Sequence, residues 1–239
     1  PRCFWSGSVA GRWQLRSSER GGVSEVVTHG VEADTRRMND PERVLSFWLE
    51  PKPTTEDELA TRQKMWFMGG KELDEQIKRE FADRVESARR GELDGWAATA
   101  RGRLALIILL DQFTRNLHRG SPQAFASDAK AAALSVSGYD ANLFEGLDAI
   151  DHMFLSLPFS HAEDLELQKR AVRHAVHFAR GVRPEWKSLT RASVDFARKH
   201  LDVVARFGRF PHRNAVLGRE STAEEIEYLE YLRDAGQWL

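Results

Sequence analysis

Hydrophobic positions recur along the chain at spacings of three and four residues, which is the period of an amphipathic α-helix. The clearest stripe is formed by Leu73, Ile77, Phe81 and Val85, and Gly91 supplies a stop after it. A glycine just past the last periodic residue is typical of a helix C-terminus. No strand-like alternation of apolar and polar residues competes with this pattern, so the sequence predicts an all-α fold.

Capping residues, prolines and glycines mark where the helices begin. Helix starts are predicted near residues 40, 55, 71, 96, 121, 143, 160, 184 and 221. Pro158 is expected to end one helix, and Ser160 with Glu163 has the capping-box spacing that opens the next. Ser221 and Glu224 have the same spacing before the last helix. About nine helices joined by short connections favour antiparallel neighbours, in a bundle or a stack of helical hairpins.

The run from Leu104 to Leu110 is apolar on every side and is therefore expected to be buried on every side, at the centre of the fold. It is also the longest apolar run, and it is far shorter than the about 20 residues that a membrane-spanning helix needs. The sequence predicts no membrane partner.

Residues 1–37 differ from the rest of the chain, because they contain arginine but no lysine, several Gly and Ser residues, and no helical periodicity. They are predicted to be a disordered N-terminal extension, and Met38 is expected to be the natural start. Residues 38–239 are predicted to form a single all-helical domain.

The charges are balanced, with 35 Lys and Arg against 36 Asp and Glu and a formal net charge of −1. Such a chain has no global field that attracts nucleic acid, so no nucleic-acid partner is expected. Cys3 is the single cysteine, which excludes an internal disulfide framework and a thiolate metal cluster. A cytoplasmic location is the expectation that fits these features.

Polar residues that could take part in binding or catalysis are concentrated in three blocks, at positions 111–120, 160–164 and 206–219. The second block is expected to begin a helix, where free backbone N–H groups favour an anion. If every connection reverses the chain, the three blocks fall at the same end of the helical stack. The sequence therefore predicts one shared site.

Arginines with a few other polar residues form the candidate ligand-binding set. Guanidinium groups bind carboxylates and phosphates through paired hydrogen bonds, so a small anionic ligand or an acidic peptide is the expected partner. The alternative is a structural network in which acidic side chains occupy the same arginines. The set comprises Asp111, Arg115, Asn116, Arg119, Arg209, Arg213, Asn214 and Arg219, with Asp111 able to pair with Arg115 one helical turn away.

Candidate acid–base residues are His161 and His212, because imidazole titrates near neutral pH, with Glu163 able to orient either ring. Structural hydrogen bonds are the alternative role for all three, and for Glu163 a helix cap is a sufficient one. No metal site is predicted, since His161, Glu163, His200 and His212 match no compact ligand spacing. No cofactor is expected.

Several strings carry a family resemblance: WFMGGKELDEQIKREF, LALIILLDQFTRNLHRG, AFASD, LPFSHAEDLELQ and RFGRFPHRNAVLGRESTAEE. Over about residues 41–232 they resemble the bacterial domain-of-unknown-function family 924. The resemblance implies a tetratricopeptide-like all-α fold and no established activity.

Two functions remain open for this uncharacterised helical chain. One is a closed pocket for a small anionic metabolite, in which a histidine transfers a proton. The other is a tetratricopeptide-like adaptor that receives a peptide or a protein partner on a concave surface. Whether the chain is an enzyme is not decided by these residues.

Overall fold

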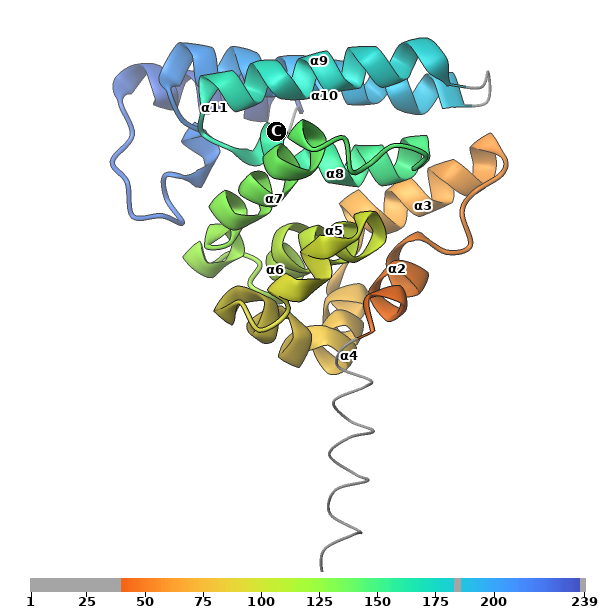
Figure 1. Ribbon diagram of the computed structural model, residues 1–239. Coiled ribbons are helices and arrows are strands. Elements are labelled where there is room, and N and C mark those ends of the chain that lie inside the picture. Colours follow the sequence, from red (N-terminus) through yellow and green to blue (C-terminus); the bar gives the residue numbers. More distant parts are fainter. Residues whose placement is uncertain (1–39, 183–185, 237–239) are drawn as a thin grey trace, which may run out of the picture. The chain divides into compact units, whose positions relative to one another are not determined.

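The computed structural model describes residues 40–182 and 186–236, and the secondary structure of these residues is helical (Figure 1). The α-helices are α2 (Pro41–Leu49), α3 (Glu56–Met68), α4 (Lys71–Arg90), α5 (Ala100–Ile107), α6 (Thr114–Leu117), α7 (Asp128–Asp140), α8 (Ala149–His161), α9 (Leu165–Gly181), α10 (Lys187–Phe207) and α11 (Ala223–Asp234). Shorter turns are η1 (Asp94–Ala98), η2 (Ile108–Phe113), η3 (Pro122–Phe125) and η5 (Pro211–Arg213). No strand occurs in the described ranges, which confirms the all-α prediction. The predicted N-terminal extension and the expected start at Met38 lie outside the described residues.

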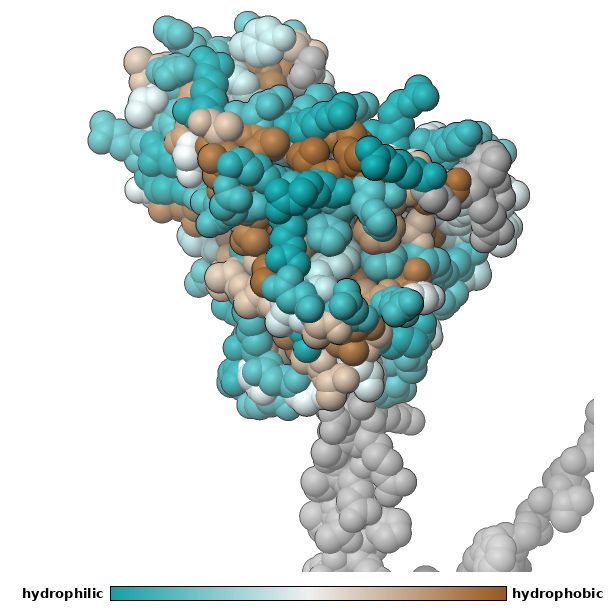
Figure 2. Space-filling model, turned by 45° about the horizontal axis from the view of Figure 1, so that its top comes forward, coloured by the Kyte–Doolittle hydropathy of each residue, from teal (hydrophilic) through white to brown (hydrophobic). Residues whose placement is uncertain are grey.

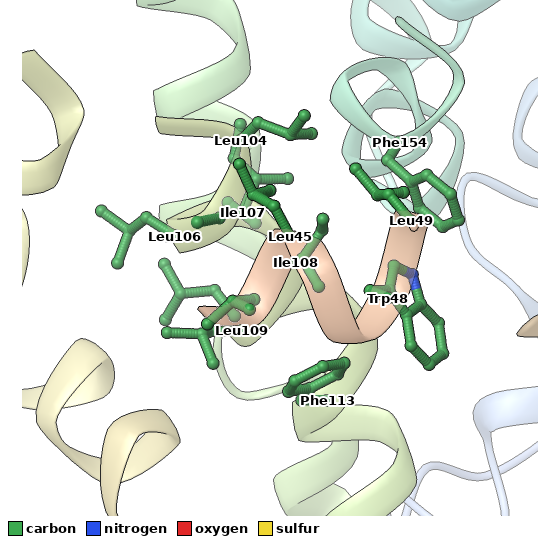
Figure 3. Close-up of a cluster of buried hydrophobic side chains, with 14 of the residues drawn as sticks. Leu45, Trp48, Leu49, Leu104, Leu106, Ile107, Ile108, Leu109, Phe113 and Phe154 are labelled. Atoms are coloured by element: carbon green, nitrogen blue, oxygen red, sulfur yellow. The ribbon is translucent and has the colours of Figure 1, made fainter. Parts of the chain in front are cut away.

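The central rod of the fold is formed by α5 and the turn η2 that continues it. All residues from Leu104 to Leu110 are at most 1% exposed, so the prediction of burial on every side is confirmed. Figure 3 shows Leu45, Trp48 and Leu49 of α2 packed against this rod, with Phe113 and Phe154 beside them. Shortening one of these leucines to alanine is expected to cost about 2–5 kcal/mol of stability, because the site cannot collapse from any side.

Helix α8 lies between two groups of helices (Figure 1). On one side it packs against α9 and α10, which run side by side in opposite directions. On the other side it packs against α7, α5 and η2. Because α8 contacts both groups, a side chain at its C-terminal end can reach the central rod and the C-terminal segments together.

Figure 2 shows a face on which hydrophilic residues predominate and a band of hydrophobic residues lies between them. Among the helices that the structure describes, none is both long and apolar enough to cross a lipid bilayer.

Two predicted helix boundaries around Pro158 are wrong. Pro158 does not end its helix but lies inside α8, which continues to His161. Ser160 is a buried residue of that helix and not a cap. The cap of α9 is Asp164, whose carboxylate accepts a hydrogen bond of 2.9 Å from the N–H of Leu167. Because Pro158 has no N–H, it cannot donate to the carbonyl of Phe154, and α8 continues for only three more residues.

Other helix starts also differ from the prediction. The helix predicted to begin near residue 143 begins at Ala149, where Asp148 is the cap. Ser121 caps only the short turn η3, and α7 begins later, at Asp128. The last capping box lies one residue further along than predicted, with Thr222 and Glu225 as its two partners. Glu225 is buried, and its carboxylate also accepts hydrogen bonds from Arg209, so tertiary contacts set the register of α11.

Candidate functional site

The central rod changes its hydrogen bonding where the first polar block begins. Residues Ile108–Phe113 form a π-helical turn between α5 and α6, and the hydroxyl of Thr114 donates to the carbonyl of Leu109 at 3.0 Å. Asp111 and Gln112 lie in this turn and are both buried. Single π-helical turns inside α-helices frequently occur at functional sites, because they displace side chains from their regular positions. The position of Asp111 in this turn makes it a candidate site residue.

Asp111 and His161 form a buried pair, called the dyad below. The Nδ1 atom of His161 lies 2.7 Å from Oδ1 of Asp111. An ionised carboxylate only accepts, so Nδ1 carries the proton and Nε2 is the acceptor nitrogen of the ring. Nε2 makes no hydrogen bond to a described residue. Burial and Arg115 lower the pKa of His161 despite the nearby Asp111, so the ring is neutral at neutral pH.

Arg115 holds the Asp111 carboxylate from the other side. Its Nη1 donates to the backbone carbonyl of Asp111 at 2.8 Å and to Oδ1 at 3.0 Å, which confirms the predicted pair. Its Nη2 donates to Oδ2 of Asp128 at 2.9 Å. Burial opposes ionisation of Asp111, but Arg115 and His161 outweigh it and lower the pKa of this carboxyl. Asp111 therefore stays ionised.

Arg213 brings the third polar block to the same place. Its Nη1 lies 3.0 Å from the carbonyl of His161 and 3.4 Å from Oδ2 of Asp128. The guanidinium carbon lies 4.6 Å from the ring centre of Phe125 and 4.5 Å from that of Phe210. Burial lowers the pKa of Arg213 to about 10, so the group is cationic at neutral pH. Its Nη2 makes no hydrogen bond to a described residue and is available to a ligand.

The three polar blocks therefore meet, as the reversal of chain direction predicted. The reason for the position of His161 differs from the prediction, however. His161 is the last residue of α8 and does not begin a helix. A helix C-terminus carries exposed carbonyl groups and does not attract an anion. The helix that follows this block is α9, and its N-terminus is capped by the carboxylate of Asp164.

A cavity of about 560 Å³ adjoins these side chains. Its polar lining includes Gln112, Arg115, Asn116, Arg119, Ser160, His161, His200, His212 and Arg213. Its apolar lining includes Trp66, Phe67, Phe125, Met153, Leu157, Phe178 and Phe196. This volume lies within the usual range of sites for small molecules, which is roughly 300–1,000 Å³.

Two further histidines line the cavity. His200 is 4% exposed, its Nδ1 lies 3.0 Å from the carbonyl of Phe196, and burial lowers its pKa to about 3. His212 is exposed on its outer side, yet desolvation and the charge of Arg213 lower its pKa as well. Both rings are therefore uncharged at neutral pH. Within the described ranges, no three His, Cys, Asp or Glu side chains are arranged to hold a metal ion.

Asn116 and Arg119 line the cavity but are already bound to the carboxylate of Asp74. The amide of Asn116 donates to it at 2.8 Å, and Arg119 makes two hydrogen bonds of 2.8 Å. Arg119 lies beyond α6, which ends at Leu117. These two residues form the rim next to α4.

Five of the predicted site residues lie outside the lining of the cavity. One is Asp111, which reaches the cavity only through His161. The other four are Glu163, Arg209, Asn214 and Arg219. Glu163 accepts hydrogen bonds from Arg219 at 2.6 and 2.9 Å and from the N–H of Phe210 at 2.8 Å. Arg209 and Asn214 both donate to Glu225. This network fastens the loop that carries Arg213.

Asp128 is a residue that the sequence reasoning missed. It is the carboxylate that Arg115 and Arg213 share, although it begins α7 and belongs to none of the three blocks. Gln168 is another, and it lies on α9, after the second block. It is fully buried, and its side chain donates to the carbonyls of Ser160 at 2.8 Å and Ala162 at 2.7 Å, which fixes the backbone around His161. Its place one turn into α9 was the only available indication.

Comparison with known proteins agrees with this organisation. A model of a family described as "Bacterial protein of unknown function (DUF924)" matches residues 44–232. A solved structure, a protein of unknown function, ATU0120 from Agrobacterium tumefaciens, is 34% identical, with a TM-score of 0.67 over 80% of this chain and 97% of that one. A comparison with curated proteins gives no match. The chain thus belongs to the bacterial DUF924 family of proteins of unknown function.

Proposed function

We propose that the cavity binds a small anionic metabolite and that His161, oriented by Asp111, transfers a proton to or from it. The observation that carries the proposal is His161 in the cavity wall, with its Nδ1 bonded at 2.7 Å to Asp111, which does not line the cavity. A histidine held in one tautomer by a buried carboxylate is the usual arrangement of a general base.

The neutral state of His161 supports this role. A base must be unprotonated before it accepts a proton, and burial together with Arg115 lowers the pKa of this ring. When His161 takes up a proton, the adjoining Asp111 carboxylate stabilises the imidazolium that forms. Asp111 is thus a positioning residue for His161.

Arg213 is the proposed anchor for the anion. Its Nη1 is occupied by Asp128 and the carbonyl of His161, whereas Nη2 has no hydrogen bond to a described residue. Arg115 is more fully engaged, because Asp111 and Asp128 take both of its terminal nitrogens. His212, on the same turn as Arg213, is the proposed partner acid or base. Glu163 acts indirectly by holding the loop.

The test is a thermal-shift screen with small carboxylates and phosphates on the full chain. A binding compound is expected to raise the melting temperature by about 5–10 °C at a hundredfold excess over its dissociation constant. Arg213→Gln should lose this shift. Arg206→Gln is the matched control, because Arg206 lies on the exposed surface and pairs with Glu224.

His161→Asn completes the design, because its amide retains a donor toward Asp111 but does not titrate. This variant should still bind the compound. A screen in which no anion gives a shift that depends on Arg213 would overturn the proposal. Folding of each variant is checked by its far-ultraviolet circular dichroism.

An adaptor with tetratricopeptide-like stacked hairpins is the second candidate. It is favoured by two exposed apolar side chains at the end of α3, Phe67 at 52% and Met68 at 75% exposure. Peptide binding that persists in Arg213→Gln but is lost in Met68→Ser would favour the adaptor.

A further inference from the structure

One wall of the cavity follows α8 along most of its length. Ala149, Met153, Leu157 and His161 all line the cavity, and they are four residues apart. Residues at this spacing lie on one face of a helix. With a rise of 1.5 Å per residue, the wall extends over about 18 Å from Ala149 to His161. The dyad therefore lies at one end of an elongated space.

The other walls of this space combine large apolar side chains with a few uncharged polar ones, Gln63, Thr190 and Ser193. Phe178 comes from α9, Phe196 from α10, and Trp66 and Phe67 from α3. The fully charged side chains in the lining are Arg115, Arg119 and Arg213, which come from α6, the turn after it and η5. Charge and apolar surface are thus contributed by different helices.

The end of the cavity that contains the three arginines carries no net positive charge, because each arginine is paired with a carboxylate. Arg115 and Arg213 are matched by Asp111 and Asp128, His161 is neutral, and Arg119 is paired with Asp74. A buried charge without a partner is expensive, so a ligand with two or more negative charges would add charge that nothing balances. A ligand with a single negative charge adds the smallest imbalance, and it can accept a hydrogen bond from Nη2 of Arg213, which has no such bond to a described residue.

Resting on the proposed function of this cavity, we infer that its ligand is a singly charged carboxylate with an elongated apolar body, of the alkyl or arylalkyl type. The carboxylate accepts a hydrogen bond from Nη2 of Arg213, and the body lies along Leu157 and Met153, past the unprotonated Nε2 of His161. Phosphate monoesters carry about −1.5 to −2 charges at pH 7 and are disfavoured at this balanced end.

The experiment measures dissociation constants for a series of straight-chain carboxylates, from butanoate to octanoate, and for 3-phenylpropanoate. Each added methylene that enters the apolar section is expected to tighten binding about fourfold. Glutarate and glucose 6-phosphate are the polyanionic and polar controls, and they should bind at least tenfold more weakly than octanoate.

A variant that fills the apolar section tests the position of the body. Ala175 lines the cavity from α9, whereas Ala179, one turn later on the same helix, does not. Ala175→Leu should weaken octanoate binding at least tenfold and leave butanoate unchanged, and Ala179→Leu should change neither. Both variants keep a strong helix former, so neither is expected to unfold α9.

Chain-length dependence that is lost in Ala175→Leu supports the inference. Affinity that does not rise with chain length, or equal affinity for glucose 6-phosphate, would overturn it. If the carboxylates or glucose 6-phosphate still bind in a way that depends on Arg213, the proposed function survives. If no anion of either kind binds, the inference and the proposed function both fail.

Discussion

At the scale of single residues, burial keeps several histidines of this fold uncharged. The pKa values of His152 and His174 are lowered to about 4, and that of His200 to about 3, with desolvation as the main cause in each case. His152 is 9% exposed, and its Nδ1 lies 3.1 Å from the hydroxyl of Tyr139. An uncharged ring packs against its aromatic neighbours without the cost of burying a charge.

Lowered histidine pKa values make stability depend on pH in a defined direction. Between about pH 4 and the ordinary value of 6.5, the unfolded chain binds more protons at His152 than the folded protein does. Stability is therefore greatest above pH 6.5 and is lost as the pH falls through this window. His174 and His200 act in the same direction.

His152→Gln should reduce the slope of unfolding free energy against pH by up to about 1.4 kcal/mol per pH unit in this window. Urea unfolding at a series of pH values measures the slope. Identical profiles for wild type and His152→Gln would show that this ring does not contribute.

Sequence reasoning identified individual site residues with mixed success. Arg115, His161 and Arg213 meet, and the Asp111–Arg115 pair has the predicted spacing. Asp128 escaped notice because its importance arises only when α7 is placed beside Arg115 and Arg213. A lone acid at the start of a helix has an ordinary local explanation, so its tertiary partners could not be predicted.

At the scale of elements, helix ends and turns position the site. The π-helical turn η2 carries Asp111, the last residue of α8 is His161, and the short turn η5 carries Arg213. The loop between α10 and α11 is held by the bidentate pair of Glu163 and Arg219, together with the N–H of Phe210. The pKa of Glu163 is lowered, because Arg219 and this N–H outweigh the effect of burial.

Breaking this pair should loosen the loop and the anion anchor together. Glu163→Gln is expected to cost about 1–3 kcal/mol of stability, as for hydrogen bonds to charged groups. It should also weaken binding of any ligand that depends on Arg213. Urea unfolding and ligand titration provide the two measurements.

Glu224→Gln is the matched control, since Glu224 pairs with Arg206 on the open surface, where ion pairs contribute less than about 1 kcal/mol. If Glu163→Gln and Glu224→Gln had equal effects on both stability and binding, the loop would not depend on Glu163.

The helices themselves were easier to predict than their ends. Apolar periodicity depends on neighbours within one helix, and it correctly indicated α4, the central rod and the all-α class. Boundaries depend on contacts that form only on folding: Ser160 is buried inside α8, and Glu225 is fixed by Arg209. The predicted capping boxes failed for this reason, because the same spacing occurs at positions where tertiary contacts determine the outcome.

At the scale of the whole described unit, the path of the chain brings together residues that are about 50 positions apart. The order of helices predicted this convergence, since successive antiparallel helices return polar ends to one side. The cavity and its apolar walls were not predicted, because volume depends on how α3, α8, α9 and α10 are spaced. Side-chain periodicity contains no information about that spacing.

The most direct test of the central claim is the ¹⁵N NMR spectrum of the His161 ring, recorded without and with saturating octanoate. We expect a neutral ring at pH 7, protonated at Nδ1, whose Nε2 resonance shifts when the carboxylate binds. We also expect the Nε2 shift to be absent in Arg213→Gln. A ring that is cationic in the free protein, or unchanged while octanoate binds, would contradict the assignment of His161 as the base of a ligand site.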